Sequence, residues 1–91
     1  GFHTLEMQTG NISSVMTEEA YDLILANINK NVLLDEMETY AKKLLNGGQL
    51  LLSGFYESDI ADISKKAEKY GLTPQGKKVR NKWTSLLFRK E

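Results

Sequence analysis

The sequence predicts an α/β protein in which two helices pack on a layered sheet with an antiparallel edge. Two short apolar runs, at residues 23–26 and 50–52, are typical of strands buried on both faces, as in a parallel sheet. A helical pattern lies between them, and the order strand–helix–strand favours a parallel pair with a right-handed crossover. A short turn near the carboxyl terminus predicts that the last two strands are antiparallel.

The first predicted strand is short. Residues 4–9 alternate weakly between apolar and polar side chains, and the turn pair Gly10-Asn11 ends the pattern. Residues 21–28 form the first buried strand, which places Asn27 at its carboxyl end.

A helix is predicted over residues 31–45. Asn29 or Asn31 can cap its start, since a side-chain oxygen there accepts a free backbone N–H. The segment Asn46-Gly47-Gly48 ends it, because a left-handed residue is needed at that point and glycine adopts it without strain. The apolar stripe of this helix consists of Leu33, Met37, Tyr40, Ala41 and Leu44.

The second half follows the same pattern. Residues 49–54 form another buried strand, and residues 58–70 form a helix that begins at the cap Ser58 and stops at Gly71. Three further elements complete the chain: a strand at 72–79, which Pro74 assigns to an edge, a turn at 80–82, and a final strand at 83–89.

Composition excludes several kinds of site. The 91 residues include no cysteine and one histidine, His3, so disulfides, thiol nucleophiles, thiolate metal sites and histidine clusters are excluded. Apolar runs of three to four residues are too short for a transmembrane helix. The length indicates one small domain at most, or part of a larger one.

Charge is divided unevenly along the chain. Residues 1–40 hold one base and seven acids, whereas residues 41–91 hold eleven bases and five acids. We favour two charged halves that face each other, or face absent parts of a larger protein, over an anionic partner. The run Lys77, Lys78, Arg80 and Lys82 beside Trp83 allows nucleic-acid binding, but a solvated edge hairpin with Trp83 as a core or interface residue is favoured.

Ligands of open α/β sheets bind outside the carboxyl ends of the strands. Three predicted loops qualify, at residues 10–11, 27–30 and 54–57. Asn27 is the strongest candidate, because an amide directly after a buried strand offers a fixed acceptor and a fixed donor. The other interpretation, a helix-capping asparagine, stays open.

Several segments resemble one family in order and spacing. The stretch YDLILANI resembles the segment after the fourth strand of class I methyltransferases, and most closely that of the bacterial PrmA-type enzymes that methylate amino groups of ribosomal protein L11. The segments LLNGG, LLSGF, AEKYGL and NKWTSL resemble later motifs of that family. The resemblance covers about residues 4–90 and implies a partial Rossmann-like class I methyltransferase sheet with two helices and a carboxyl-terminal antiparallel hairpin.

The resemblance also implies a cofactor and a site. The cofactor is S-adenosylmethionine, and Asn27 is the catalytic residue that contacts both the cofactor and the incoming amine. Ile28, Gly10 and Asn11 are the other implied cofactor-binding residues, with Asn11 replacing the aspartate that relatives often have. Asn29, Gly54 and Phe55 are implied to line the substrate pocket, and no metal is implied.

The implied function is methyl transfer to lysine or α-amino groups of a large-subunit ribosomal protein in the cytoplasm, without a membrane. Two alternatives stay open: a class I methyltransferase acting on RNA or another protein, and a non-catalytic RNA- or protein-binding module that uses the basic hairpin. Residues 21–91 match the carboxyl-terminal half of the catalytic domain. The family's glycine-rich loop and ribose-binding acid are not in this sequence, so we expect the isolated chain to be inactive.

The same resemblance bears on residues 1–20. In the usual sheet order of the family, the strand at residues 4–9 lies beyond two strands that this sequence lacks. We therefore expect residues 1–20 to be without their native partner, and either to be mobile or to pack elsewhere.

Overall fold

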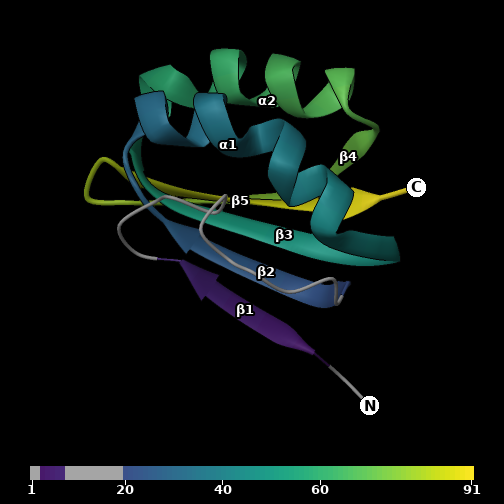
Figure 1. Cartoon of the computed structure of the whole chain (residues 1–91). Coiled ribbons are helices and arrows are strands. Elements are labelled where there is room, and N and C mark those ends of the chain that lie inside the picture. Colours follow the sequence, from purple (N-terminus) through teal and green to yellow (C-terminus); the bar gives the residue numbers. More distant parts are fainter. Residues whose placement is uncertain (1–2, 8–19) are drawn as a thin grey trace.

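The computed structural model describes residues 3–7 and 20–91 and forms one five-stranded sheet with two α-helices (Figure 1). The sheet order is β1-β2-β3-β5-β4, so the final strand β5 lies between β3 and β4. The elements are β1 (Thr4–Met7), β2 (Tyr21–Asn27), α1 (Lys30–Lys43), β3 (Leu44–Tyr56), the short 3-10 helix η2 (Glu57–Asp59), α2 (Ile60–Lys69), β4 (Leu72–Arg80) and β5 (Trp83–Lys90).

The predicted α/β class is confirmed by the strand pairing. β2 and β3 are parallel, with Ile24 opposite Leu50 and Asn27 opposite Ser53, and helix α1 connects them. β3 and β5 are antiparallel, as are β4 and β5. The carboxyl ends of β2 and β3 therefore meet at one end of the sheet, where the amino terminus of β5 also lies.

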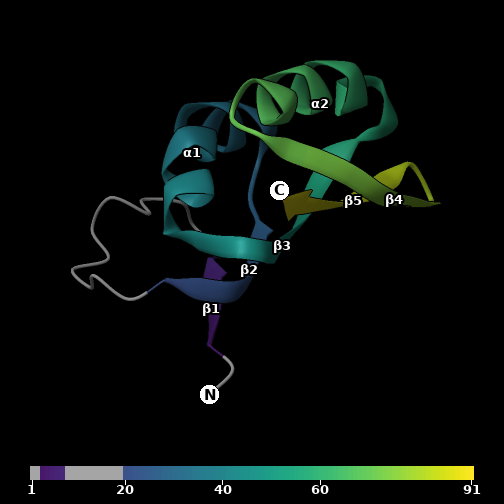
Figure 2. The ribbon, with the colours of Figure 1, turned by 90° about the vertical axis from the view of Figure 1, so that its right-hand side faces the viewer.

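Both helices cover the same face of the sheet (Figures 1 and 2). The core lies between them and that face, and Ile24, Leu50 and Leu52 are fully buried there. The stripe residues Leu33 and Met37 of α1 are fully buried as well. On the opposite face the leucines are only half-buried, and no helix among the described residues covers them: Leu23, Leu25, Leu51 and Leu87.

Helix α1 ends earlier than the sequence predicts. It stops at Lys43, and the buried Leu44 donates its N–H to the carbonyl of Tyr40 while its own backbone is already extended. The left-handed glycine, Gly47 with φ of +83°, therefore lies inside β3 and does not terminate the helix. Leu44 is buried, as the apolar stripe of the predicted helix indicated, but it belongs to β3 and not to α1.

The predicted cap of the second helix is also wrong. Ser58 lies in η2, and α2 begins at Ile60. The carboxylate of Asp59 accepts the backbone N–H of Tyr56 at 3.1 Å, which closes the turn between β3 and α2. This bond caps η2, whereas α2 follows Asp59 without a side-chain cap.

The predicted carboxyl-terminal hairpin is confirmed. Asn81 and Lys82 form its two-residue turn with φ of 50° and 72°, values that match the type I′ turns typical of tight hairpins. Strand β4 contains Pro74 and lies at the edge of the sheet, as predicted. No helix in the described ranges is long and apolar enough to span a membrane.

The first strand has a partner within the chain. Thr4–Met7 pairs in parallel with β2, with Leu5 opposite Ile24. Of the two expected outcomes, the structure therefore shows packing for residues 4–7. Most of residues 8–20, including the predicted turn at Gly10-Asn11, lies outside the described residues. The expected mobility of residues 1–20 stays a prediction.

Candidate functional site

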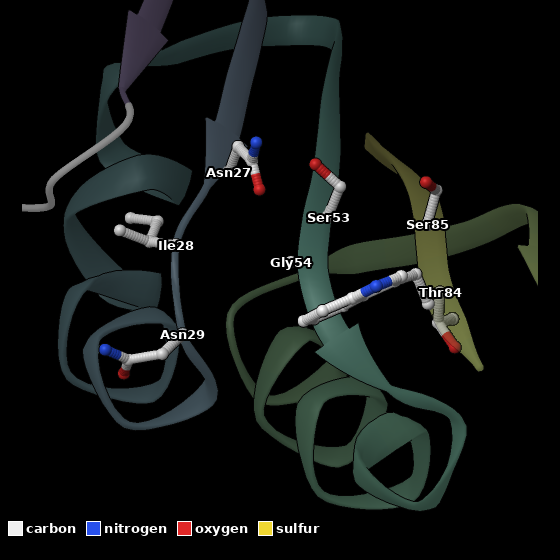
Figure 3. Close-up of a pocket in the computed structure, with 8 residues that line it drawn as sticks. Asn27, Ile28, Asn29, Ser53, Gly54, Thr84 and Ser85 are labelled. Atoms are coloured by element: carbon white, nitrogen blue, oxygen red, sulfur yellow. The ribbon is translucent and has the colours of Figure 1, made fainter. Parts of the chain in front are cut away.

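A cleft of about 810 Å³ opens at the carboxyl ends of β2 and β3 (Figure 3). Three strands contribute to it, because β5 begins where β3 ends. Such a position is the usual ligand site of open α/β sheets. The lining residues are Asn27, Ile28, Asn29, Ser53, Gly54, Trp83, Thr84 and Ser85.

Asn27 occupies the centre of this arrangement. It is the last residue of β2, its side chain is exposed, and its amide lies between β2 and β3 in Figure 3. The structure therefore brings the strongest sequence candidate to the mouth of the cleft. Its side chain makes no cap for α1, so the helix-capping interpretation of Asn27 is wrong.

Gly54 makes room for the amide of Asn27. A Cβ atom at Gly54 would lie 2.5 Å from Oδ1 of Asn27 and 3.3 Å from the backbone nitrogen and oxygen of Ile28. The φ of Gly54 is +95°, a value that side-chain-bearing residues rarely adopt. The backbone conformation and the contacts with the backbone of Ile28 thus favour glycine at this wall of the cleft, and an added Cβ would displace the exposed amide of Asn27.

The loop after β2 is held to β3 by its backbone. Ile28 is buried and donates its N–H to the carbonyl of Ser53 at 3.2 Å. Asn29 then caps α1, since its Oδ1 accepts the N–H of Val32 at 3.1 Å. Of the two capping candidates, the structure therefore selects Asn29 over Asn31, and Asn29 also lines the cleft.

Phe55 does not line the cleft, contrary to the sequence expectation. It is buried in the core, because the register of β3 shifts between Ser53 and Phe55. Strict alternation from Leu50 and Leu52 would turn Phe55 to the opposite face, and the irregularity at Gly54 returns it to the helix-covered side. Gly10 and Asn11 lie outside the described residues.

Sequence reasoning missed the wall that β5 contributes. Trp83, Thr84 and Ser85 line the cleft only because β5 pairs with β3, and no sequence pattern shows that order. Trp83 is 53% exposed, so the core interpretation of this side chain is wrong. Its indole stacks on the ring of Tyr56, with centroids 5.2 Å apart and planes 15° apart.

Thr84 carries a buried hydroxyl. The residue is 1% exposed, and its Oγ1 has no hydrogen-bond partner within the described part of the chain. An unpaired buried hydroxyl is costly, which makes Thr84 a point of local weakness beside the cleft.

An ion-pair cluster joins the start of α1 to η2 and to the first turn of α2. Nζ of Lys30, the first residue of α1, lies 2.6 Å from Asp62 and 3.7 Å from Asp59. The hydrogen bond between Lys30 and Asp62 raises the pKa of the Lys30 ammonium and lowers the pKa of the Asp62 carboxyl. Both shifts favour the charged pair.

The cleft itself is electrically neutral. None of its lining side chains is a carboxylate or an ammonium, and its polar side chains include those of Asn27, Asn29, Ser53 and Ser85. Such a site offers hydrogen bonds and alignment in place of a strong acid–base pair. Among the described residues, no group of three potential ligand side chains is placed to hold a metal ion.

The basic residues of the hairpin lie on the surface. Lys77, Lys78 and Arg80 are exposed on the edge strand β4, and Lys82 is exposed in the turn. Lys77 and Lys78 border a separate, smaller depression with Leu51 and Leu87. Nucleic-acid binding by this run stays a prediction.

The sequence comparisons agree with the fold. The family model described as "Ribosomal protein L11 methyltransferase (PrmA)" matches residues 3–91. The ribosomal protein L11 methyltransferase of Porphyromonas gingivalis is 45% identical over 84 residues, which cover 92% of this chain and 29% of the relative. The same-named protein of Bacteroides thetaiotaomicron is 39% identical over 84 residues, covering 92% and 30%. The chain therefore spans about a third of the length of these relatives.

Solved structures show the same arrangement. The ribosomal protein L11 methylase of Lactobacillus delbrueckii subsp. bulgaricus superposes with a TM-score of 0.80 at 26% identity, covering 91% of this chain and 43% of the other. A methyltransferase of Pyrococcus furiosus, at 22% identity and a TM-score of 0.69, shares the fold. The predicted partial methyltransferase sheet is thereby confirmed, and the chain belongs to the ribosomal protein L11 methyltransferase (PrmA) family.

Proposed function

We propose that this chain forms the acceptor side of an S-adenosylmethionine-dependent methyltransferase site that modifies amino groups of a large-subunit ribosomal protein. The observation that carries the proposal is the position of Asn27, whose amide oxygen lies against Gly54 at the mouth of a neutral cleft. Membership of the L11 methyltransferase family supplies the substrate class. A ribosomal-protein substrate implies a cytoplasmic location.

Asn27 is proposed to orient the attacking amine. An amine must be neutral to act as a nucleophile, and its N–H groups can then donate to Oδ1 of Asn27 while the lone pair points away from them. Because Oδ1 lies against Gly54 and β2 is paired with β3 on the same residues, the acceptor needs little reorganisation. Alignment of this kind is the main contribution that a protein makes to an in-line displacement.

The cleft is compatible with the reactive end of the cofactor. Its volume of about 810 Å³ falls within the range of small-molecule sites. S-adenosylmethionine, when bound, supplies an electrophilic methyl group on a sulfonium centre. Asn27 and Ile28 are the described residues that would hold this end, and the lack of an ammonium in the lining avoids repulsion of the sulfonium charge.

Trp83 is proposed to close the acceptor side. The indole is half-exposed, lines the cleft and stacks on Tyr56, so it presents an aromatic wall to whatever enters. An amine stem packed on such a wall loses contact with water, which favours the neutral amine over its ammonium form. The indole of Trp83 and the amide oxygen of Asn27 would therefore act on the same substrate amine.

The test is Asn27→Ala in the complete protein, with Asn31→Ala as the matched control. Asn31 is an exposed asparagine of α1 that neither caps the helix nor lines the cleft. We expect the turnover number for methylation of the ribosomal protein to fall about a hundredfold in Asn27→Ala and to stay unchanged in the control. Methyl transfer at the normal rate in Asn27→Ala would overturn the assignment.

Calorimetry on the 91-residue chain provides a second test. We expect S-adenosylmethionine to bind this chain weakly or not at all, because the described cleft contains no carboxylate to hold ribose hydroxyls. Binding at micromolar affinity would show that the chain holds the cofactor by itself and would refute this part of the proposal.

A second candidate function uses the basic hairpin. Its four exposed cationic side chains, on β4 and the following turn, are the observation that favours RNA binding. If the chain binds RNA through them, binding weakens with salt, and the quadruple neutral variant of Lys77, Lys78, Arg80 and Lys82 loses it. Undiminished binding by that variant would exclude the hairpin as the RNA site.

A further inference from the structure

The cleft is bounded by two loops that meet at their base. The first follows β2 and contains Asn27 and Ile28; the second runs from Gly54 through η2. They touch where the amide oxygen of Asn27 lies against Gly54 and where the N–H of Ile28 donates to the carbonyl of Ser53. These contacts fix the bottom of the cleft but leave the outer ends of both loops to be held by something else.

Lys30 occupies an unfavourable position for its own helix. It is the first residue of α1, directly after the cap Asn29, and the first turn of α1 contains no acidic residue. The amino terminus of a helix carries a partial positive charge, which favours anions and disfavours a lysine ammonium. Local helix preference therefore does not favour Lys30 at this position, so its partners outside α1 are of interest.

One partner of Lys30, Asp59, ends the second loop, and the other, Asp62, lies in the first turn of α2. Nζ lies 2.6 Å from Oδ2 of Asp62 and 3.7 Å from Oδ1 of Asp59, and the Asp59 side chain is only 19% exposed. The second oxygen of Asp59 accepts the backbone N–H of Tyr56 at 3.1 Å. One carboxylate thus binds the end of β3 and faces the start of α1 at the same time.

We propose that Lys30 is a positioning residue that fixes the spacing of the two loops and thereby keeps Asn27 aligned with Gly54. This clamp joins Lys30, at the start of α1 directly after the first loop, to Asp59 at the end of the second loop and to Asp62 in the first turn of α2. The expected effect of Lys30 on the turnover number rests on the proposed function. Its expected effect on the spacing of the two loops does not.

The matched control for Lys30 is an ion pair that lies entirely within α1. Lys42 lies 3.4 Å from Glu38 one turn away on α1, and both side chains are well exposed. Lys42→Met therefore removes a lysine charge from α1 without touching the cleft. Lys30→Arg is the conservative variant, because arginine retains the charge and reaches carboxylates readily.

Amide hydrogen exchange on the 91-residue chain measures the spacing directly. In Lys30→Met we expect the amides of Ile28 and Tyr56 to exchange about two- to fivefold faster, while the amide of Leu50 in the core is unchanged. Lys30→Arg restores slow exchange, and Lys42→Met leaves both amides at their original rates. Equal acceleration at Ile28, Tyr56 and Leu50 would indicate global destabilisation. No acceleration at all would indicate that Lys30 does not hold the loops. Either result would overturn the proposal.

Kinetics on the complete protein separate this inference from the proposed function. We expect Lys30→Met to lower the turnover number about two- to fivefold at unchanged KM for the cofactor, and Lys30→Arg to restore it. If Lys30→Met leaves the turnover number unchanged while Asn27→Ala lowers it, the positioning role is refuted and the function stands. If local exchange accelerates but Asn27→Ala is fully active, the clamp stands and the function is wrong.

Discussion

Alanine substitutions at three glycines of this chain separate the cost of backbone strain at positive φ from the cost of crowding by an added Cβ atom. Gly54 combines a positive φ of +95° with a crowded site, where an added Cβ meets Oδ1 of Asn27 at 2.5 Å. Gly71 has a positive φ of +79° but nothing within 4 Å of an added Cβ. Gly76 has neither feature. An alanine substitution at Gly54 therefore measures side-chain crowding and backbone strain together. The same substitution at Gly71 measures backbone strain alone, and at Gly76 it measures neither.

The expected magnitudes follow from these environments. A non-glycine residue held at positive φ costs on the order of 1–3 kcal/mol, and we expect Gly71→Ala to lose about 1 kcal/mol of unfolding free energy. Gly54→Ala adds the displacement of the Asn27 amide and the 3.3 Å contacts with the backbone of Ile28, for a total of about 2–3 kcal/mol. Gly76→Ala stays within roughly 0.5 kcal/mol of the parent.

Urea unfolding at 25 °C measures all three variants by one signal. The chain has a single tryptophan, Trp83, which lines the cleft and reports through its fluorescence. Equal denaturant slopes are required before the midpoints are compared, because a changed slope indicates a changed unfolded or native state. If Gly54→Ala costs no more than Gly71→Ala, then the crowding of Gly54 by Ile28 and Asn27 adds nothing to the backbone strain, and Gly54 is not the fixed wall of the acceptor that the reasoning assumes.

Two further predictions concern buried hydroxyl groups. Thr84→Val replaces the buried, unpaired Oγ1 with a methyl group and should raise the unfolding free energy by about 1 kcal/mol in urea denaturation; a loss would show that the hydroxyl has a partner. Burial first, and then the hydrogen bond to Glu36, raise the pKa of Tyr40 above its ordinary value of 10. Since the folded pKa is the higher one, its contribution to stability is complete below pH 10 and is lost as the pH rises further. Tyr40→Phe should therefore shift the alkaline unfolding transition, followed by circular dichroism, to higher pH, and an unchanged midpoint would contradict the cause assigned.

Much of the fold was predictable because its determinants are local. The apolar runs of β2 and β3 mark the strands, although only the face under the helices is fully buried, and the 3.6-residue stripe of α1 marks the helix face that the sheet covers. The tight turn at Asn81 and Lys82 requires no tertiary information either. Asn27 could be singled out for the same reason, since the end of a buried strand is visible as the end of an apolar run.

The boundaries between elements were less predictable. Leu44 fits the helical stripe, yet it begins β3, because its backbone is paired opposite Tyr21 of β2. Ser58 is a good helix cap in isolation, but Asp59 closes the turn and α2 starts later. In the first place a contact from another element decides between two locally acceptable conformations, and in the second a hydrogen bond within the turn does so.

By itself, the sequence determined the α/β class, the parallel pair, the edge hairpin and the candidate Asn27, because short-range periodicity and turn chemistry encode them. Only the tertiary structure decided that β5 lies beside β3, which brings Trp83 and Thr84 to the cleft, and that a register shift at Gly54 buries Phe55. It also decided that Lys30 faces Asp59 of η2 and Asp62 of α2. These features depend on which strand pairs with which and at what register, and that choice is made by the packing of the whole sheet, which no single segment of the chain contains.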